Sequence, residues 1–576
     1  MTTQPAPTVD RRPLWIEGGF VLLAVLLRLA AWQSIEGTWD ATHPRVDAYT
    51  YWQQTLQLLA GEQPFSGGYY QPPGYPWLMA WEQGLSEAPD PRISRAFNLL
   101  FGVLSTLGLG RLGRVVSGWK WGGAVAMGLF VLAGAPLRYE LDLLTPAASL
   151  LAMVVGLNLL LPTDRHPLWA LGAGLVSGAA ALLHPTTLLA WVFIGAVLLV
   201  RQRLHGVLLL VGLALPIAPI AWENRTQHES GALISENGGL NLYLFNNPEW
   251  KETAFLRPGL PFRQLVLDAE PHRRDLQARN AYWRARTRDE WSLSWALPAL
   301  VEKAWWSIHA RPIPRNEDWR CRTEGSLAWL AWMPNRVAWL VPFALLGCVA
   351  QARSRRWLLP AALLGGWLPL LLFLPAERYR VVLWPVLVLL TVTSLGELRD
   401  AVRARQVPRW WAAGVGLWIA ALWPIDHITA KQPGWCAHRE GNLAIEQRQY
   451  AEAEAHYLEA ARAEPANAGH WFWLAQARLR QKDSRGAIEA LERSAALFPD
   501  YFETRKQLQK EYGRQGEYLL AAEHAGAGCA LPDAPAIICA RHVELLWKAG
   551  ERQRARAFVA EHPELRAEER VQRLGL

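Results

Sequence analysis

The sequence predicts an all-α protein in which a polytopic membrane helical bundle is followed by an α-solenoid of helical hairpins. Three observations support this fold class. Apolar runs recur up to about residue 424, and many of the 32 Trp residues stand at their ends, as interfacial anchors do. The tail beyond is rich in Ala, Glu and Arg and repeats small residues at a fixed period.

The composition agrees with a membrane domain joined to water-exposed parts. A chain of 576 residues is too long for one compact domain, and 51% hydrophobic with 19% charged residues fits this mixture. The net charge of +8 comes without a basic stripe or a nucleic-acid-binding motif. We therefore interpret the charge as membrane orientation and expect no nucleic-acid partner.

The apolar segments predict about 11 membrane helices, some of them shorter than the ~20 residues that an untilted span needs. The segments are Leu14–Gln33, Ile93–Gly110, Trp121–Leu137, Leu143–Leu161, Leu168–Leu183, Thr186–Val200, Gly206–Trp222, Trp329–Ala350, Trp357–Leu374, Tyr379–Leu395 and Trp410–Trp423.

The basic residues predict the sidedness of these helices. If the tail of residues 1–13 is cytoplasmic, nearly all Lys and Arg residues near helix ends fall inside, and the short outer turns carry only Arg138, Arg378 and Arg380. The membrane domain then covers residues 14–428, with outer loops at 34–92 and 223–327, and an odd helix count places the C-terminal tail outside.

The loop after the first helix has the most unusual sequence. It reads HPRVDAYTYW and, after a polar spacer, YYQPPGYPWLMAW. Asp47 is a lone carboxylate near Tyr49, and Pro72 and Pro73 predict a rigid bend because each proline fixes φ and restricts the preceding residue. The simpler reading is an ordinary interfacial loop, since Tyr and Trp gather at any membrane boundary.

This loop resembles the first extracytoplasmic loop of GT-C membrane glycosyltransferases, particularly family 39 with its protein mannosyltransferase and aminoarabinose transferase relatives. The resemblance implies an inverting single displacement, with Asp47 as the base and a polyprenyl-phosphate sugar as the donor substrate. It also implies that Tyr49, Tyr70, Gln71, Pro72 and Pro73 position substrate. Aminoarabinose transferases tend to carry a charged residue where this chain has Gln71, which argues against importing their substrate.

Two further segments fit the same resemblance. Arg378, Tyr379 and Arg380, in PAERYRVVLWP, are expected at the outer mouth of the tenth helix, where they would bind the donor phosphate. Membrane-edge anchoring is the alternative for these arginines. The segment Gly239–Pro248 resembles a Gly-Asn-Leu-Tyr and Asn-Asn-Pro pattern of these enzymes and adds Asn241 as a substrate-positioning residue.

Several charged or polar residues in or near the helices remain open. Glu140 and Asp142, in an outer turn, are candidates for positioning the acceptor or for holding a divalent metal, and metal dependence stays undecided. Charges inside membrane helices usually have a partner or a function. This applies to Arg28, which could instead extend to the interface, and to Arg95, near Asn98. His184 is interpreted as a capping or interfacial residue.

The tail carries a period of 34 residues. Ala453, Ala487, Ala521 and Ala555 follow this spacing, as do Pro465 and Pro499. A small residue that lets two helices approach, with a proline closing the second helix, is the pattern of tetratricopeptide repeats. We predict three to four repeats over residues 434–569. Among Cys321, Cys436, Cys529 and Cys539, the last two are the favoured disulfide pair.

The resulting hypothesis is a glycosyltransferase in the inner membrane of a bacterium. It would use a lipid-linked sugar donor, and its periplasmic repeats would recruit a protein or glycan acceptor. Two alternatives remain: an oligosaccharyltransferase similar to O-antigen ligases, whose essential residues are Arg and His in a large outer loop, and a non-enzymatic membrane anchor for a repeat scaffold.

Overall fold

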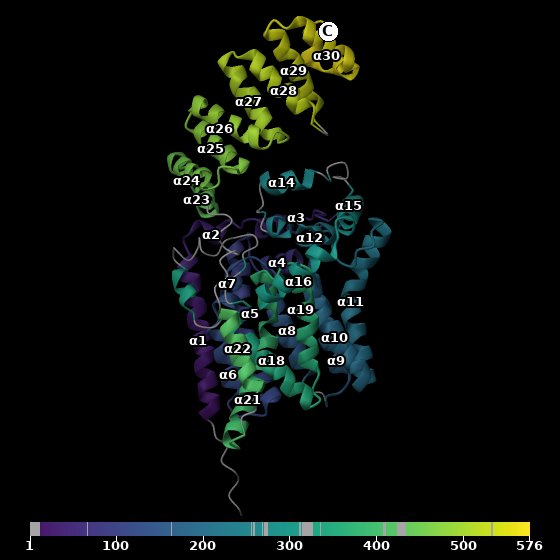
Figure 1. The fold of residues 1–576 in the computed structure, drawn as a ribbon, viewed down its shortest axis with the longest axis vertical. Coiled ribbons are helices and arrows are strands. Elements are labelled where there is room, and N and C mark those ends of the chain that lie inside the picture. Colours follow the sequence, from purple (N-terminus) through teal and green to yellow (C-terminus); the bar gives the residue numbers. More distant parts are fainter. Residues whose placement is uncertain are drawn as a thin grey trace, which may run out of the picture. The chain divides into compact units, whose positions relative to one another are not determined.

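The computed structural model of the chain consists of helices and their connections (Figure 1). It describes residues 12–65, 67–162, 164–254, 256, 260–267, 269, 275–309, 313, 327–333, 336–406, 410–422, 434–531 and 534–576. The predicted all-α class is confirmed, since no β-strand occurs in these ranges. Two compact units are present: unit 1 comprises Met1–Phe255 with Arg274–Ile425, and unit 2 comprises Leu256–Arg273 with Asp426–Leu576.

Each of the eleven apolar segments overlaps a helix of unit 1. These helices are α1 (Arg12–Ile35), α5 (Pro91–Ser117), α6 (Gly122–Val131), α8 (Pro146–Leu160), α9 (Leu168–Leu183), α10 (Leu188–Arg201), α11 (Arg203–Gln227), α18 (Val337–Arg353), α19 (Leu358–Leu372), α21 (Trp384–Arg403) and α22 (Trp410–Leu422). Within the described residues, four helical stretches are long and apolar enough to cross a membrane: Arg12–Ile35, Pro91–Ser117, Arg203–Gln227 and Glu377–Arg403.

Prolines move two of the expected helix boundaries. A helix continuing from 121 to 137 would place Pro136 in its interior, where the ring clashes with a preceding carbonyl. Instead α6 ends at Val131 and a separate helix, α7, covers Gly134–Leu141. Similarly, α21 starts at Trp384, so that Pro385 lies in its first turn, where a missing N–H costs nothing.

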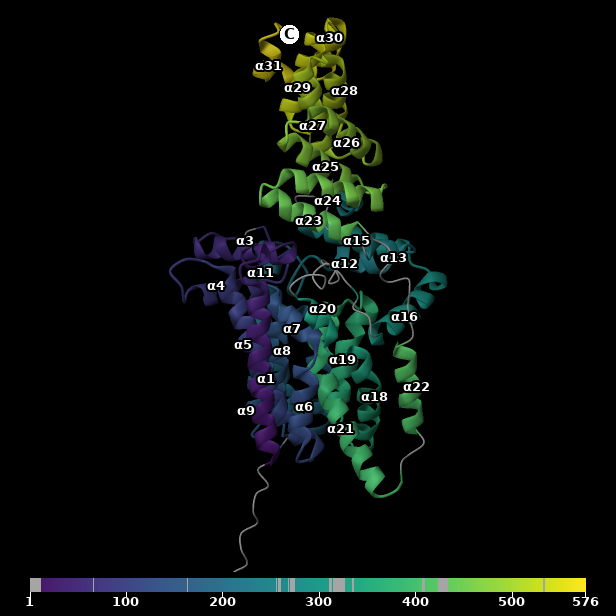
Figure 2. The same ribbon diagram turned by 90° about the vertical axis from the view of Figure 1, so that its left-hand side faces the viewer.

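The two predicted outer loops form short helices, and these helices lie together at one end of the bundle (Figures 1 and 2). The first loop forms α2 (Trp39–Thr42), α3 (Asp47–Leu59) and α4 (Gly74–Gln83). The second contributes α12 (Gly238–Phe245), α13 (Trp250–Thr253), α15 (Leu276–Asp289) and α16 (Leu293–Ile308), and α20 (Glu377–Arg380) joins them. The chain segments singled out by sequence thus share this end of unit 1.

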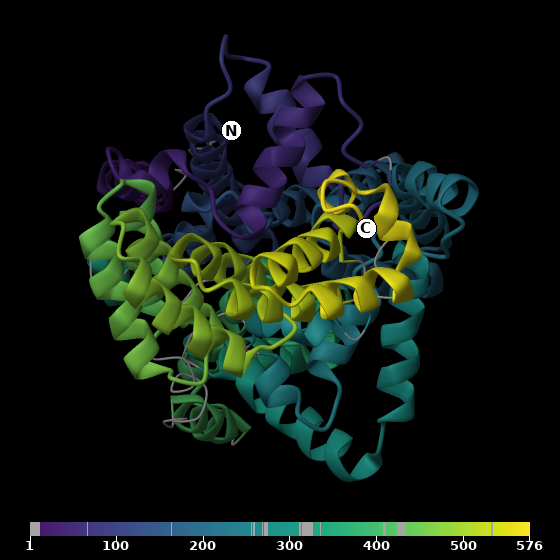
Figure 3. The same ribbon diagram turned by 90° about the horizontal axis from the view of Figure 1, so that it is seen from above.

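Unit 2 is a row of four helical hairpins that follow a curve (Figure 3). The hairpins are α23 (Trp435–Glu446) with α24 (Tyr450–Ala463), α25 (Ala468–Arg480) with α26 (Ser484–Leu497), α27 (Phe502–Gln515) with α28 (Tyr518–Cys529), and α29 (Ala536–Lys548) with α30 (Arg552–Glu561). Ala453, Ala487, Ala521 and Ala555 each lie in the second helix of a hairpin and are fully buried. Their period therefore marks the positions of closest helix approach.

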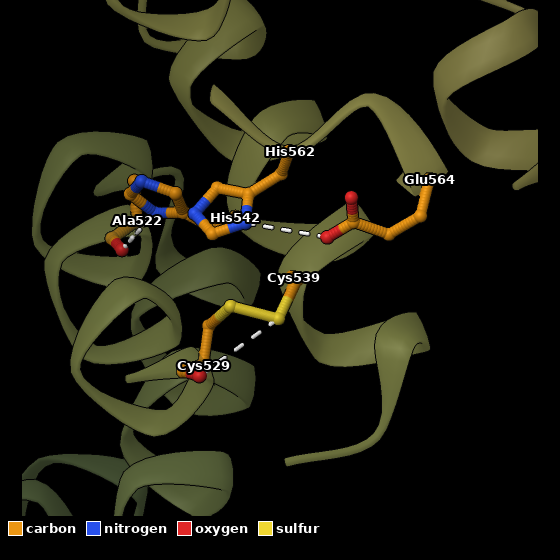
Figure 4. The surroundings of a disulfide bond; sticks show 6 residues. All are labelled: Ala522, Cys529, Cys539, His542, His562 and Glu564. Carbon is orange, nitrogen blue, oxygen red and sulfur yellow. Dashed lines mark hydrogen bonds and ion pairs between the residues drawn. A yellow bond between two sulfur atoms is a disulfide. The ribbon is translucent and has the colours of Figure 1, made fainter. Parts of the chain in front are cut away.

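The end of the row also contains the predicted disulfide. Cys529, at the end of α28, is bonded to Cys539 in α29, so the bond joins the third hairpin to the fourth (Figure 4). Beside it, His542 Nδ1 lies 2.7 Å from the carbonyl oxygen of Ala522. Cys321, the other candidate from unit 1, and the first 11 residues of the predicted cytoplasmic tail lie outside the described residues.

Candidate active site

Asp47 and Arg378, the two central residues of the sequence hypothesis, are in direct contact. Arg378 Nη1 donates a hydrogen bond to Asp47 Oδ2 at 2.6 Å, and Arg378 Nη2 donates to Tyr379 Oη at 2.5 Å. The side chains of Asp47 and Arg378 are 25% and 18% exposed. The pair is therefore partly desolvated yet still open to a ligand.

The local structure explains how Asp47 is presented. Asp47 is the first residue of α3, a position that favours negative charge because the free N–H groups of a helix point outward there. Val46, just before it, has φ 53°, a backbone conformation that β-branched residues rarely adopt. A sharp change of direction thus precedes the carboxylate, and the helix begins at the carboxylate itself.

The helical spacing of α3 places Tyr49 and Tyr51 on different faces of the helix. Asp47, Tyr51 and Thr55 are spaced by four and share one face, whereas Tyr49 lies two positions away from Asp47 and is 53% exposed. Burial, followed by the charge of Asp47, raises the pKa of Tyr51. Sequence reasoning chose Tyr49 and missed Tyr51, although helical spacing from Asp47 would have found it.

The diproline segment packs beneath this face. The chain bends at Tyr70 and Gln71, Pro72 and Pro73 are buried, and α4 begins at Gly74. A Cβ atom on Gly74 would lie 2.7 Å from the backbone carbonyl carbon of Leu182, so only glycine permits this approach to the end of α9.

Tyr75 connects the diproline segment to the bundle. Its ring lies 5.5 Å from that of Tyr51 in an edge-on arrangement. Its hydroxyl accepts a hydrogen bond from Asn98 Nδ2 at 3.0 Å, and the same amide nitrogen reaches the backbone carbonyl of Asp142 at 3.0 Å. Asn98 of α5 thereby holds α4 and the turn at Asp142 together.

His184 lies next to Tyr379, the residue that accepts a hydrogen bond from Arg378, and the sequence did not reveal this position. It follows α9 directly, is 6% exposed, and its ring centroid is 5.5 Å from that of Tyr379. Its Nδ1 lies 2.8 Å from Thr145 Oγ1. The interpretation as a capping or interfacial residue therefore omits its contact with the site.

The three basic residues assigned to outer turns all have protein partners. Arg138 forms a buried ion pair with Glu377, beside Arg378. Arg380 is 2% exposed and donates through Nη1 to the carbonyl oxygens of Trp306 at 3.2 Å and His309 at 2.8 Å. Arg378 faces Asp47 instead, so the structure separates the two arginines that the sequence had treated alike.

Glu140 is engaged with a helix of the bundle. Its Oε1 accepts from Arg28 Nη2 at 2.6 Å, and the two side chains are 0% and 5% exposed. Arg28 is thus paired inside the fold and does not extend to an interface. Arg95 is likewise buried and donates through Nε to the carbonyl of Leu141 at 2.9 Å.

The remaining predicted residues lie on other elements of the same end of unit 1. Arg279 lies 5.0 Å over the ring of Tyr70, and Asn241 is in α12. Gln71 Oε1 is buried with no hydrogen-bond partner among the described residues. In that part of the chain, no three His, Cys, Asp or Glu side chains gather as metal ligands would.

Comparisons with known proteins identify one segment. Residues 438–502 match the family model of the tetratricopeptide repeat, which confirms the predicted repeats over that range. The search of curated proteins found no match.

Solved structures similar to this chain have low scores. An oligosaccharyltransferase from Archaeoglobus fulgidus, tethered with an acceptor peptide, is 14% identical with a TM-score of 0.41, covering 92% of this chain and 60% of its own. ArnT from Cupriavidus metallidurans, bound to undecaprenyl phosphate, is 17% identical with a TM-score of 0.28, covering 68% and 81%. Pseudomonas aeruginosa pilF is 14% identical with a TM-score of 0.21, covering 41% and 96%. Each of these three TM-scores is below 0.5.

Proposed function

We propose that unit 1 is a membrane-embedded glycosyltransferase of the GT-C type. It transfers a sugar from a polyprenyl phosphate to an acceptor at the outer face of the membrane. The observation that carries this proposal is the contact between Asp47 and Arg378, which brings together a carboxylate and a guanidinium, a group well suited to binding phosphate. Four helical stretches of the described residues are long and apolar enough to cross a membrane, which supports a membrane location.

The chemistry follows from these two side chains. An acceptor hydroxyl or amide attacks the anomeric carbon of the sugar, and the bond from that carbon to the phosphate oxygen breaks. The bonding electrons leave with the phosphate, whose growing charge Arg378 stabilises. Asp47 takes the acceptor proton as general base. Before the donor binds, Arg378 pairs with Asp47; the donor phosphate then replaces the carboxylate and leaves Asp47 available to the acceptor.

Unit 2 is proposed to select a protein or glycan acceptor in the periplasm of a bacterium, with the N-terminus of the chain in the cytoplasm. The matched tetratricopeptide segment supports a recruiting unit. The Cys529–Cys539 disulfide supports an oxidising compartment, because cytosolic thiols stay reduced.

The test is incubation of the purified protein in lipid nanodiscs with a panel of radiolabelled polyprenyl-phosphate sugars. Turnover of one donor is expected, and Asp47→Asn is expected to abolish it while leaving the protein folded. Glu87→Gln, an exposed carboxylate of the same loop, serves as the matched control. Repeating the assay with EDTA tests the metal requirement.

Other outcomes would favour the two alternatives. If Asp47→Asn reduces turnover only mildly, a ligase that relies on Arg and His of the large outer loop becomes the better explanation. If unit 1 neither binds nor consumes any polyprenyl-phosphate sugar, the helices serve as an anchor for the repeats.

A further inference from the structure

The turn after α9 holds a histidine whose second ring nitrogen has no partner. His184 is 6% exposed and Nδ1 is engaged by Thr145 Oγ1 at 2.8 Å. Its Nε2 is buried and makes no hydrogen bond within the described residues. A buried polar atom is nearly always satisfied in a folded protein, so such an atom beside a candidate active site indicates a ligand position.

Arg378, which is linked to His184 through Tyr379, has a second donor atom without a hydrogen-bond partner in the described residues. The His184 ring is 5.5 Å from the ring of Tyr379, whose hydroxyl accepts from Arg378 Nη2. Arg378 Nε is also buried and without a hydrogen-bond partner in the described part of the chain. The cationic side chain of Arg378 and the neutral side chain of His184 therefore both lie against Tyr379. Each has one nitrogen without a hydrogen-bond partner among the described residues.

The position of His184 is fixed by the packing around it. Leu182, two residues earlier, has its backbone against Gly74, where even a Cβ atom would not fit. Thr145 lies at the start of α8 and holds the ring through Nδ1. Residues from α4, α8 and α9 thus determine where Nε2 points, and such pre-positioning is what a binding group requires.

We propose that His184 donates a hydrogen bond from Nε2–H to a phosphate oxygen of the substrate while Arg378 binds the same phosphate. The inference deepens the proposed function and rests on it. The hydroxyl of Thr145 would donate to Nδ1, which selects the tautomer that carries its proton on Nε2.

Phosphate suits this pair of donors better than a carboxylate does. A guanidinium fork occupies two oxygens of an anion, which are all that a carboxylate has. The polyprenyl phosphate released by the transfer has three terminal oxygens, so one of them is left for a third donor. A neutral imidazole supplies that bond without adding a second positive charge.

The experiment measures binding of undecaprenyl phosphate to the full-length protein in phosphatidylcholine nanodiscs. His184→Ala is expected to weaken binding at least about tenfold, as expected for loss of a hydrogen bond to a charged group. His184→Gln, which keeps an N–H near the position of Nε2, is expected to stay within about threefold of wild type. His166→Ala, an exposed histidine before α9, is the matched control.

A companion pair of variants tests the assigned tautomer. Thr145→Val keeps the volume but removes the hydroxyl and is expected to weaken binding, whereas Thr145→Ser retains the hydroxyl and should retain binding.

Competition with inorganic phosphate separates the sources of the phosphate group. Weak competition indicates that the lipid chain adds to binding, and full competition at equal concentration indicates a site for free phosphate. Separate titrations of donor and acceptor should show that His184→Ala has a raised KM for donor and an unchanged KM for acceptor.

The possible outcomes distinguish a wrong assignment of His184 from a wrong proposed function. If wild type binds undecaprenyl phosphate and folded His184→Ala binds equally well, the assignment of His184 is wrong and the proposed function stands. If His184→Ala and His184→Gln are equally impaired, the residue supports the packing and donates nothing to phosphate. If wild type binds no polyprenyl phosphate, both the inference and the proposed function are wrong.

Discussion

Asp47 and Arg378 stand 331 positions apart in the chain, yet their side chains form a 2.6 Å ion pair where α3 and α20 begin. Asp47 lies in the first predicted outer loop, and Arg378 lies shortly before α21. The contact therefore joins two of the three segments that carry the resemblance stated in the sequence analysis.

The fork of Arg378 is the first feature to test. Arg378→Lys keeps the charge but carries its donors on a single nitrogen, so it cannot hold the Tyr379 hydroxyl and grip a phosphate with a planar fork at the same time. We expect donor binding to weaken by about tenfold or more. Binding of undecaprenyl phosphate measures this, and Arg225→Lys, at an exposed position in α11, should leave it unchanged. Equal binding by Arg378→Lys would show that charge alone suffices.

The buried Arg28–Glu140 pair is predicted to matter for stability. Glu140→Leu leaves the Arg28 charge buried without its carboxylate, and loss of one partner of such a pair typically costs about 3–5 kcal/mol. Replacing both residues by Leu removes the uncompensated charge and should recover most of the loss. Denaturant unfolding in detergent gives both values. If the double variant is no more stable than Glu140→Leu, the pair is not the cause.

Acid should destabilise the first repeat of unit 2. His438 lies 2.9 Å from His470 (Nδ1 to Nδ1), and burial, followed by the charge of His470, lowers the pKa of His438 from 6.5 to about 3. The unfolded chain then binds more protons than the folded one between these values. The contribution of neutral His438 to the free energy of unfolding is therefore complete above pH 6.5 and is lost as the pH falls below this value.

A pH series of unfolding measurements checks this. Between pH 6.5 and 5, the contribution of one such histidine amounts to at most about 2 kcal/mol. His438→Asn should flatten the acid loss, whereas His456→Asn, at a half-buried histidine of α24, should not. An unchanged acid profile in His438→Asn would show that other groups are responsible. Glu464, which accepts from His470, has a lowered pKa and adds loss of the same sign.

The 34-residue alanine period offers a test with a built-in control. Ala453→Val adds volume at a fully buried contact and should cost about 1–3 kcal/mol. Ala451→Val makes the same change two positions earlier on the exposed side of α24, with the same penalty of a β-branched residue in a helix. Limited proteolysis of unit 2 should separate the two variants. Equal sensitivity would mean that helix propensity, and not packing, decides.

The comparison of sequence and structure shows where local patterns suffice. The apolar runs and the alanine period predict the helices because burial against a neighbour repeats along one element. Asp47 and Arg378 were found because their local sequences stood out. Tyr51 was not chosen as a site residue and His184 was interpreted as a capping or interfacial residue, since their place beside the site depends on which distant elements meet around them. A one-dimensional pattern holds no information on such contacts.

Charge provides a second example of this limit. The positive-inside rule isolates Arg138, Arg378 and Arg380 as exceptions but treats them equally. The fold gives them different partners, a carboxylate in α20, the Asp47 carboxylate, and two backbone carbonyls. Of the two ion pairs, Arg378 with Asp47 is the more exposed, at 18% and 25%, and Arg138 with Glu377 is buried.

The helix α14 (Leu260–Val266) belongs to unit 2, although its residues fall between two stretches of unit 1. Leu260 is 5% exposed within the core of the repeats, and Arg263 lies 5.5 Å over the ring of Tyr501. A fragment cut at residue 434 would therefore lose Leu260 from the core of the repeats. Grafting or truncating this protein therefore has to respect three passages of the chain between the two units, at 255/256, 273/274 and 425/426.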